Sequence, residues 1–191
     1  MQEDIRQRAA RMLQAFRLRR CPASQVAHEL RNLMNVPTIR RNVDVFFLYT
    51  SNYEKIRKMV QEHEAVMYDI KEGKELLGAI LGFRNGRCLA FHAFLRIYPN
   101  LDAWSLAWMT IPKAVCFFAR KKIFIKEIIG LIPVWNHAAC RICLKLEMEE
   151  GNRQFVRNIE GEVVECRQFV LQVPDTWHHP YAKGIQLLCS Q

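Results

Sequence analysis

The chain has 191 residues, of which half are hydrophobic and a quarter are charged, and its formal net charge is +9. This length suffices for one domain with a sizeable buried core, and the composition is ordinary for a folded protein. No apolar run is long enough to cross a bilayer, which excludes a membrane-spanning protein.

The positive charge is concentrated near the N-terminus. Residues 1–41 contain nine Arg and three acidic residues, so +6 of the +9 lies there. We interpret residues 1–42 as an N-terminal helical basic arm, with an amphipathic helix over 3–19 and a second helix that Ser24 caps and that ends near Met34. The Arg side chains are either a solvated helix face or a surface for nucleic acid or another anion.

The seven Cys residues lie mostly in apolar segments. Cys140 and Cys143 form a CxxC, but no second pair or flanking His completes a zinc set, so we expect no metal. The N-terminal residues are charged from Glu3 onward and have no secretory pattern. Reduced thiols and the missing pattern predict a cytoplasmic protein.

After the arm, strands and helices alternate. The predicted elements are a strand over 43–49, a helix over 51–62, strands over 65–71, 75–84 and 87–98, a helix over 101–118, a strand over 125–133, a helix over 136–146, and strands over 154–159 and 163–173. Asn85-Gly86 is a strong hairpin signal. Pro112 is expected to kink its helix or to start a new one capped by Thr110. The tail, 174–191, has no clear period.

The strand, helix and strand around 87–135 form a crossover unit, which places one parallel pair inside an otherwise antiparallel sheet. The predicted fold class is therefore α/β (α+β), with a mixed, mostly antiparallel central sheet.

The segment IIGLIPVWNHAACRICLKLEMEEGNRQFVRNIEGEVVECRQFVL leads from a strand through Asn-x-x-Ala-x-Arg-Ile-x-x-Lys-Leu into a hairpin. Together with the element order, it resembles the GNAT superfamily of acetyl-CoA-dependent acyltransferases, in its ribosomal-protein-acetyltransferase-like and phage-type branches. The resemblance covers about residues 43–173, which we take as the acyltransferase domain. It implies a GNAT-like sheet with a splayed parallel strand pair, flanked by helices.

In such folds the two parallel strands, here 87–97 and 125–133, pair at first and then separate. Backbone groups are left without partners, and the amides of a pantetheine arm can pair with them. The opening is expected between 93–96 and 131–136. The implied contacts to acetyl-CoA come from Ala93, Phe94, Leu95, Arg96, Ile132, Asn136 and Arg141. A role for Asn136 as a helix cap alone is the alternative.

The resemblance also points to His92 as the general base, since a His of the phage-type branch lies on the same strand. A near-neutral pKa would suit the removal of a proton from an amine, directly or through water. The alternative is a half-buried His with a structural hydrogen bond. Asp69 and Glu75, on neighbouring strands, are the fallback bases.

Three departures from the family pattern concern the cofactor loop, the thiol-protonating Tyr of many members, which is Cys143 on the last helix here, and the end of that helix. The family's pyrophosphate loop is rich in Gly, whereas residues 96–107, RIYPNLDAWSLA, have none and place Asp102 at the helix start, where an acid competes with phosphate. The Gly-Phe expected after Lys-Leu is replaced by Glu147-Met148, so the usual Gly helix stop is gone.

The function that we expect is that of an acetyl-CoA-dependent N-acetyltransferase, acting on an amine of a protein or small molecule. The alternative is a GNAT-fold binding or structural protein of phage or prophage origin that no longer catalyses. Nucleic-acid binding through residues 1–41 is a third hypothesis, and a homodimer is compatible with the sequence.

Overall fold

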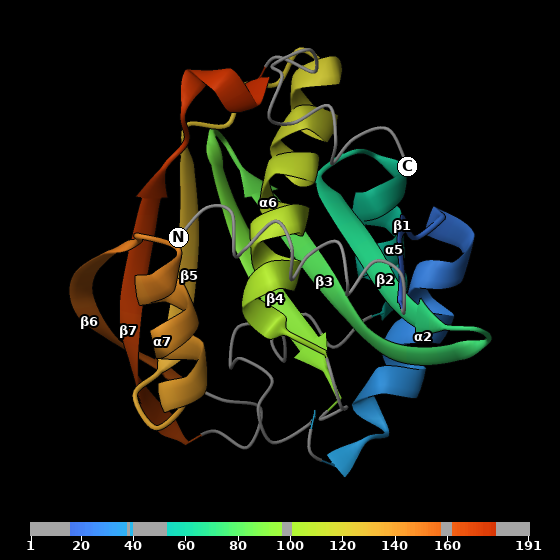
Figure 1. Cartoon of the computed structure of the whole chain (residues 1–191), viewed down its shortest axis with the longest axis horizontal. Coiled ribbons are helices and arrows are strands. Elements are labelled where there is room, and N and C mark those ends of the chain that lie inside the picture. Colours follow the sequence, from blue (N-terminus) through green and yellow to red (C-terminus); the bar gives the residue numbers. More distant parts are fainter. Residues whose placement is uncertain (1–15, 38, 40–52, 97–100, 158–161, 179–191) are drawn as a thin grey trace.

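The computed structural model describes residues 16–37, 39, 53–96, 101–157 and 162–178. Its elements, shown in Figure 1, are β1 (Arg17–Arg20), α2 (Ala23–Met34), α5 (Tyr53–Gln61), β2 (Ala65–Glu72), β3 (Glu75–Asn85), β4 (Cys88–Leu95), α6 (Ala103–Arg120), β5 (Glu127–Pro133), α7 (His137–Lys145), β6 (Glu149–Arg157), β7 (Val163–Gln172) and η1 (Asp175–His178). From residue 53 onward they follow the predicted order. The strand predicted over 43–49 lies outside the described residues.

The strands form one sheet in the order β1-β2-β3-β4-β5-β7-β6. All neighbouring strands are antiparallel except β4 and β5, which are parallel and are connected by α6. The mixed, mostly antiparallel sheet with one parallel pair and flanking helices is confirmed. The parallel pair follows from the crossover, because a helix between two strands returns the chain to the same end of the sheet.

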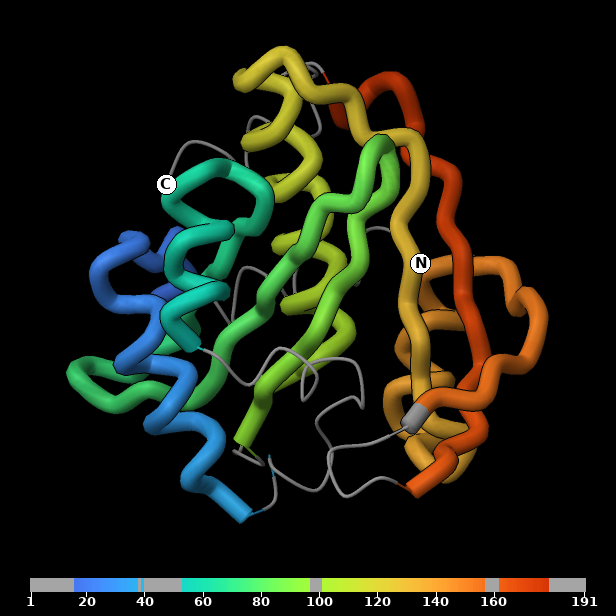
Figure 2. The backbone as a smooth tube through the Cα atoms, turned by 180° about the vertical axis from the view of Figure 1, so that it is seen from behind, coloured from blue at the N-terminus to red at the C-terminus, as the bar shows by residue number. Residues whose placement is uncertain are grey.

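Helices cover both faces of the sheet. Figure 1 and Figure 2 show α6 and α7 on one face and α2 and α5 on the other. Each face has its own core: Leu106, Met109 and Phe118 of α6 belong to the first cluster, and Leu30, Leu33 and Ile56 belong to the second. Because period-2 alternation separates the two cores, neighbouring side chains of one strand serve different faces.

The N-terminal region contributes a strand to the sheet. Arg17–Arg20 pairs antiparallel with β2, and Leu18 is buried in the core under α6. The helix predicted over 3–19 is therefore wrong at its C-terminal end, since residues 17–19 are extended; residues 3–15 lie outside the described part. The proposed boundary at 42–43 also lies outside it, so the arm stays a prediction as a separate unit.

Helix α6 continues through Pro112 as one helix from Ala103 to Arg120. The hydroxyl of Thr110 donates to the carbonyl of Leu106, 2.7 Å away, so this side chain binds the preceding turn rather than capping a new helix. The predicted fresh start at Thr110 is wrong. Among the described residues, no helix is both long and apolar enough to cross a membrane.

Helix α7 ends without the expected Gly. Glu147 takes the left-handed conformation, with φ of 59°, and its N–H donates to the carbonyl of Leu144 while that of Met148 donates to Cys143. These two bonds make a Schellman motif, in which position 147 is normally Gly. The helix stop therefore survives the loss of Gly, at the cost of a strained Glu, and Met148 is buried.

Candidate functional site

Strands β4 and β5 pair over only three residues. Ala90 and Ile129 form the last pair, although β4 continues to Leu95 and β5 to Pro133. Figure 2 shows the two strands close together at one end and far apart at the other. Beyond the last pair, the edges that the strands turn toward each other carry backbone groups that the sheet does not pair, which is the geometry that can accept an added strand.

A cavity of about 270 Å³ lies at this opening. It is bounded by β4, β5, the N-terminal half of α6 and one face of α7, and most of its lining is apolar. The lining includes five of the predicted site residues: His92, Ala93, Leu95, Ile132 and Asn136. A narrow apolar slot with a few polar groups suits a slender, mostly aliphatic ligand.

Asn136 begins α7. Its side-chain Oδ1 accepts a hydrogen bond from the backbone N–H of Ala139, at 3.2 Å, and its own N–H donates to the carbonyl of Pro133. The side chain is therefore an N-cap, as one of the two interpretations predicts. Because Asn136 also lines the cavity, its amide Nδ2 is available as a donor in addition to the cap.

His92 lies on β4 opposite Leu81 and is 8% exposed. Its ring meets that of Phe83 edge to face, with centroids 5.4 Å apart. Burial lowers the pKa of His92 to about 4, because the cationic ring would lose its hydration there. The near-neutral pKa expected from the sequence is wrong, and the imidazole is neutral at pH 7.

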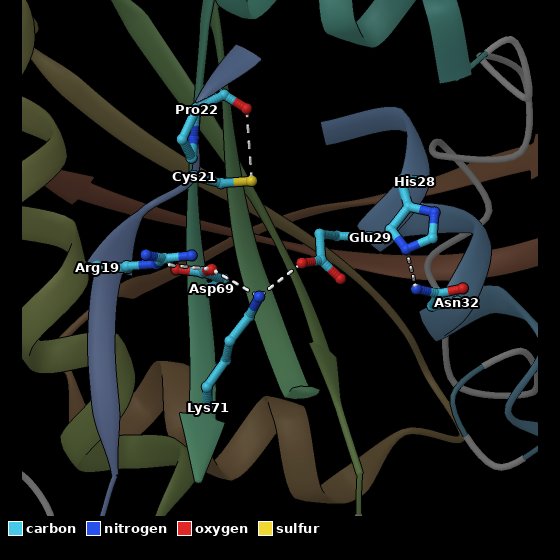
Figure 3. A network of polar contacts seen from close by, with 8 residues as sticks. All are labelled: Arg19, Cys21, Pro22, His28, Glu29, Asn32, Asp69 and Lys71. Atoms are coloured by element: carbon cyan, nitrogen blue, oxygen red, sulfur yellow. Dashed lines mark hydrogen bonds and ion pairs between the residues drawn. The ribbon is translucent and has the colours of Figure 1, made fainter. Parts of the chain in front are cut away.

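The fallback bases are engaged elsewhere. Figure 3 shows the fully buried Asp69 between Arg19 and Lys71; its Oδ2 lies 3.2 Å from Arg19 Nε and 3.5 Å from Lys71 Nζ. Lys71 also donates to Glu29 at 2.6 Å, which gives two cations and two anions in one group, of which Arg19 is partly exposed. Neither Asp69 nor Glu75 lines the cavity, and Glu75 is exposed, with Arg96 Nη1 3.0 Å away.

Three predicted cofactor contacts lie away from the cavity lining. Phe94 is fully buried in the core under α2 and α5, so its side chain turns from the cavity, and only its backbone follows the open edge. Arg96 is bound to Glu75. Arg141 is exposed on α7.

The sequence reasoning missed the wall that α6 contributes. Ala103, Ala107 and Ile111 line the cavity together with Thr110. The first three are four residues apart, which places them on one helix face. Small residues on an otherwise bulky apolar helix were the available signal, since they leave room beside the strands.

The side chain of Asp102 caps the first turn of α6 with its carboxylate. Asp102 Oδ1 accepts from the backbone N–H of Trp104 at 3.1 Å, and Oδ2 accepts from the hydroxyl of Ser105 at 2.5 Å. Lys145 Nζ lies 5.3 Å from the ring centroid of Trp104. A diphosphate at this helix end would have to displace the carboxylate or lie beside its charge, so the described residues do not fit it.

The cavity also contacts Cys143. Burial raises the pKa of this thiol to about 12, so it stays protonated and is a packing residue rather than a nucleophile. Among the described residues, no group of three or more His, Cys, Asp or Glu side chains could hold a metal ion.

No protein-family model and no curated protein sequence matches the chain. Solved structures do. A GNAT-family acetyltransferase from Streptococcus pneumoniae has a TM-score of 0.64 at 11% identity, over 83% of this chain and 99% of that one. An acetyltransferase from Salmonella typhimurium that modifies the N-terminal serine of a 50S ribosomal subunit protein has a TM-score of 0.61 at 11% identity, over 84% and 96%.

A third similar structure is the spermidine N-acetyltransferase from Vibrio cholerae, solved with CoA and spermine. Its TM-score is 0.57 at 15% identity, over 83% of this chain and 96% of that one. At these identities the similarity concerns the fold. The seven-stranded sheet, its separating parallel pair and the helices on both faces are thus those of the GNAT acetyltransferases, and the chain has the GNAT fold.

Proposed function

We propose that the chain is an N-acyltransferase of the GNAT superfamily, which moves an acetyl group from acetyl-CoA to an amine of a protein or small molecule. The observation that carries this proposal is the separation of β4 and β5 beyond Ala90 and Ile129, with a cavity at the opening. Such an opening is costly to keep unless a ligand uses it, because unpaired backbone groups need partners.

The pantetheine arm would lie along the open edges. Its amides would pair with backbone groups of β4 beyond Ala90, and Asn136 Nδ2 would donate to it from the start of α7. Ala93, Leu95 and Ile132 would contact its methylene groups, which is the role that their apolar side chains suit. When bound, the thioester supplies a carbonyl that an amine can attack, and β4 N–H groups would donate to the developing oxyanion.

His92 would accept the proton that the amine loses. Because burial lowers its pKa to about 4, the ring is neutral at pH 7 and holds a proton only weakly. It would therefore pass the proton on, through water, to the thiolate that leaves when the amide C–N bond forms and the C–S bond of the thioester breaks. Because His92 follows the same alternation as Phe94, which packs under α2 and α5, the amine would approach from that face while the thioester arm lies on the α6 and α7 face.

Unfolding temperature with and without ligand tests the binding step. A ligand at about 100 times its Kd stabilises by about 2.7 kcal/mol, which for a chain of this size is roughly 5–10 °C. We expect a shift of this order with acetyl-CoA at millimolar concentration and acetyl transfer to amines such as spermine or an N-terminal serine peptide. The absence of any shift would refute the proposal.

The alternative is a GNAT-fold binding protein, of phage or prophage origin, without catalysis. The carboxylate of Asp102 at α6 and the weak basicity of His92 favour it. It predicts a stable complex with a partner and no acetyl transfer to any amine in a panel. We also propose a cytoplasmic location, supported by the free thiols of the six described Cys residues.

A further inference from the structure

Asp102 places a carboxylate at the N-terminal end of α6. We propose that this chain recognises the pantetheine arm alone and that the nucleotide diphosphate of CoA adds no affinity. Thioesters on pantetheine, on phosphopantetheine of a carrier protein and on CoA would then be accepted alike. This inference rests on the proposed acyltransferase function and narrows its donor class.

The first argument is occupancy. The N–H groups at the start of a helix, with the helix dipole behind them, are what usually attract a phosphate. In α6 the N–H of Trp104 and the hydroxyl of Ser105 both donate to the carboxylate of Asp102. A diphosphate would meet a fixed negative charge, and the N–H of Trp104 and the hydroxyl of Ser105 are already in use.

The second argument is the state of the nearby cations. Arg96, directly after β4, is bound to Glu75 at 3.0 Å. Lys145 lies over the ring of Trp104. Arg141 lies one turn before Lys145 on the exposed face of α7 and outside the cavity lining. Arg96 is thus neutralised by Glu75, and Lys145 is a cation at the first turn of α6 whose charge the carboxylate of Asp102 balances.

The third argument is that the remaining part of the donor does have a site. The cavity is apolar, lies between the separated strands and contacts Asn136, so it fits the amide and methylene groups of pantetheine without any charge. Recognition thus rests on the strand edges and the cavity, both of which every pantetheine thioester can use.

The test is calorimetric titration of the full chain with pantetheine, with holo acyl carrier protein and with CoA. We expect the Kd for CoA to lie within fivefold of that for pantetheine. The carrier-protein titration distinguishes the sources, since tighter binding of the holo than of the apo form would show that the carried arm is read. A CoA affinity more than fivefold above that of pantetheine would overturn the inference and leave the proposed function intact.

The variant Asp102→Asn separates charge from structure, because Asn also caps helices. We expect it to increase affinity for CoA at least fivefold and to leave affinity for pantetheine unchanged. An unchanged ratio of the two affinities would overturn the role of Asp102, and a CoA preference that Arg141→Gln abolishes would assign the phosphates to α7. If neither pantetheine nor CoA binds, the proposed function fails together with the inference.

Discussion

Ala90 of β4 and Ile129 of β5 form the last pair of the parallel strands, and Ala93 lies three residues beyond it, exposed and in contact with the cavity. Ala93→Leu should therefore fill the mouth of the opening while disturbing little of the core. We expect the variant to fold with an unchanged unfolding temperature and to lose the stabilisation by acetyl-CoA, as measured by thermal unfolding. Ala119→Leu, half-buried near the other end of α6, is the matched control and should keep it.

His92 should make stability depend on pH. Its pKa is about 4 in the folded chain, against the ordinary value of 6.5 in the unfolded one, so protons favour the unfolded chain. The contribution of the neutral His92 to the free energy of unfolding is fully present above pH 6.5. It is lost as the pH falls toward 4, by about 3 kcal/mol in total. The free energy of unfolding measured in urea should decrease across this pH window. In His92→Gln this decrease should be about 3 kcal/mol smaller. Equal slopes in both proteins would contradict the buried neutral His.

Asn136 has two separable roles. Asn136→Ala should cost about 1 kcal/mol of stability, because the N–H of Ala139 loses its acceptor, and should also weaken binding of pantetheine. Asn136→Asp keeps a cap but has no amide to donate, so its stability should stay near that of the wild type while affinity drops roughly threefold to tenfold. Full affinity in Asn136→Asp would show that Asn136 is a cap alone.

Glu147 is a position where a change should stabilise. Its φ of 59° suits Gly, and a side chain in this conformation costs about 1–2 kcal/mol. Gly removes this cost but increases the conformational entropy of the unfolded chain, which cancels part of the gain. Glu147→Gly should therefore raise the free energy of unfolding by about 1 kcal/mol in urea denaturation. Glu147→Ala removes the charge but keeps the strained backbone and should give no such gain.

Most of the sheet was predictable because its signals are local. The turn at Asn85-Gly86 and the apolar spacing of the helix over 101–118 give β3, β4 and α6 directly. Strand β1 was not, because Arg17, Arg19 and Arg20 look like a solvated helix face. What makes them a strand is long-range: pairing with β2 and the ion pair between Arg19 and the buried Asp69.

The candidate site was predicted in part for the same reason. The Asn136 cap follows from a short motif, the strand separation was implied by the resemblance to the GNAT superfamily, and both are present in the structure. The pKa of His92 was wrong because desolvation depends on everything packed around the ring, which a single strand does not reveal. Thr110 and its helix face were missed because the distance of α6 from the strands is a property of the whole packing.

The short contact between β4 and β5 has a mechanical consequence. β5 pairs with β7 along its full length, from Glu127 to Pro133, but joins β4 through three residue pairs. The sheet thus consists of two parts, β1 to β4 and β5 to β7, which only these three residue pairs join. This connection is the weakest in the sheet. A ligand bound in the gap would contact both β4 and β5 and so connect the two parts of the sheet. We therefore expect ligand binding to slow amide hydrogen exchange in β4 and β5 together.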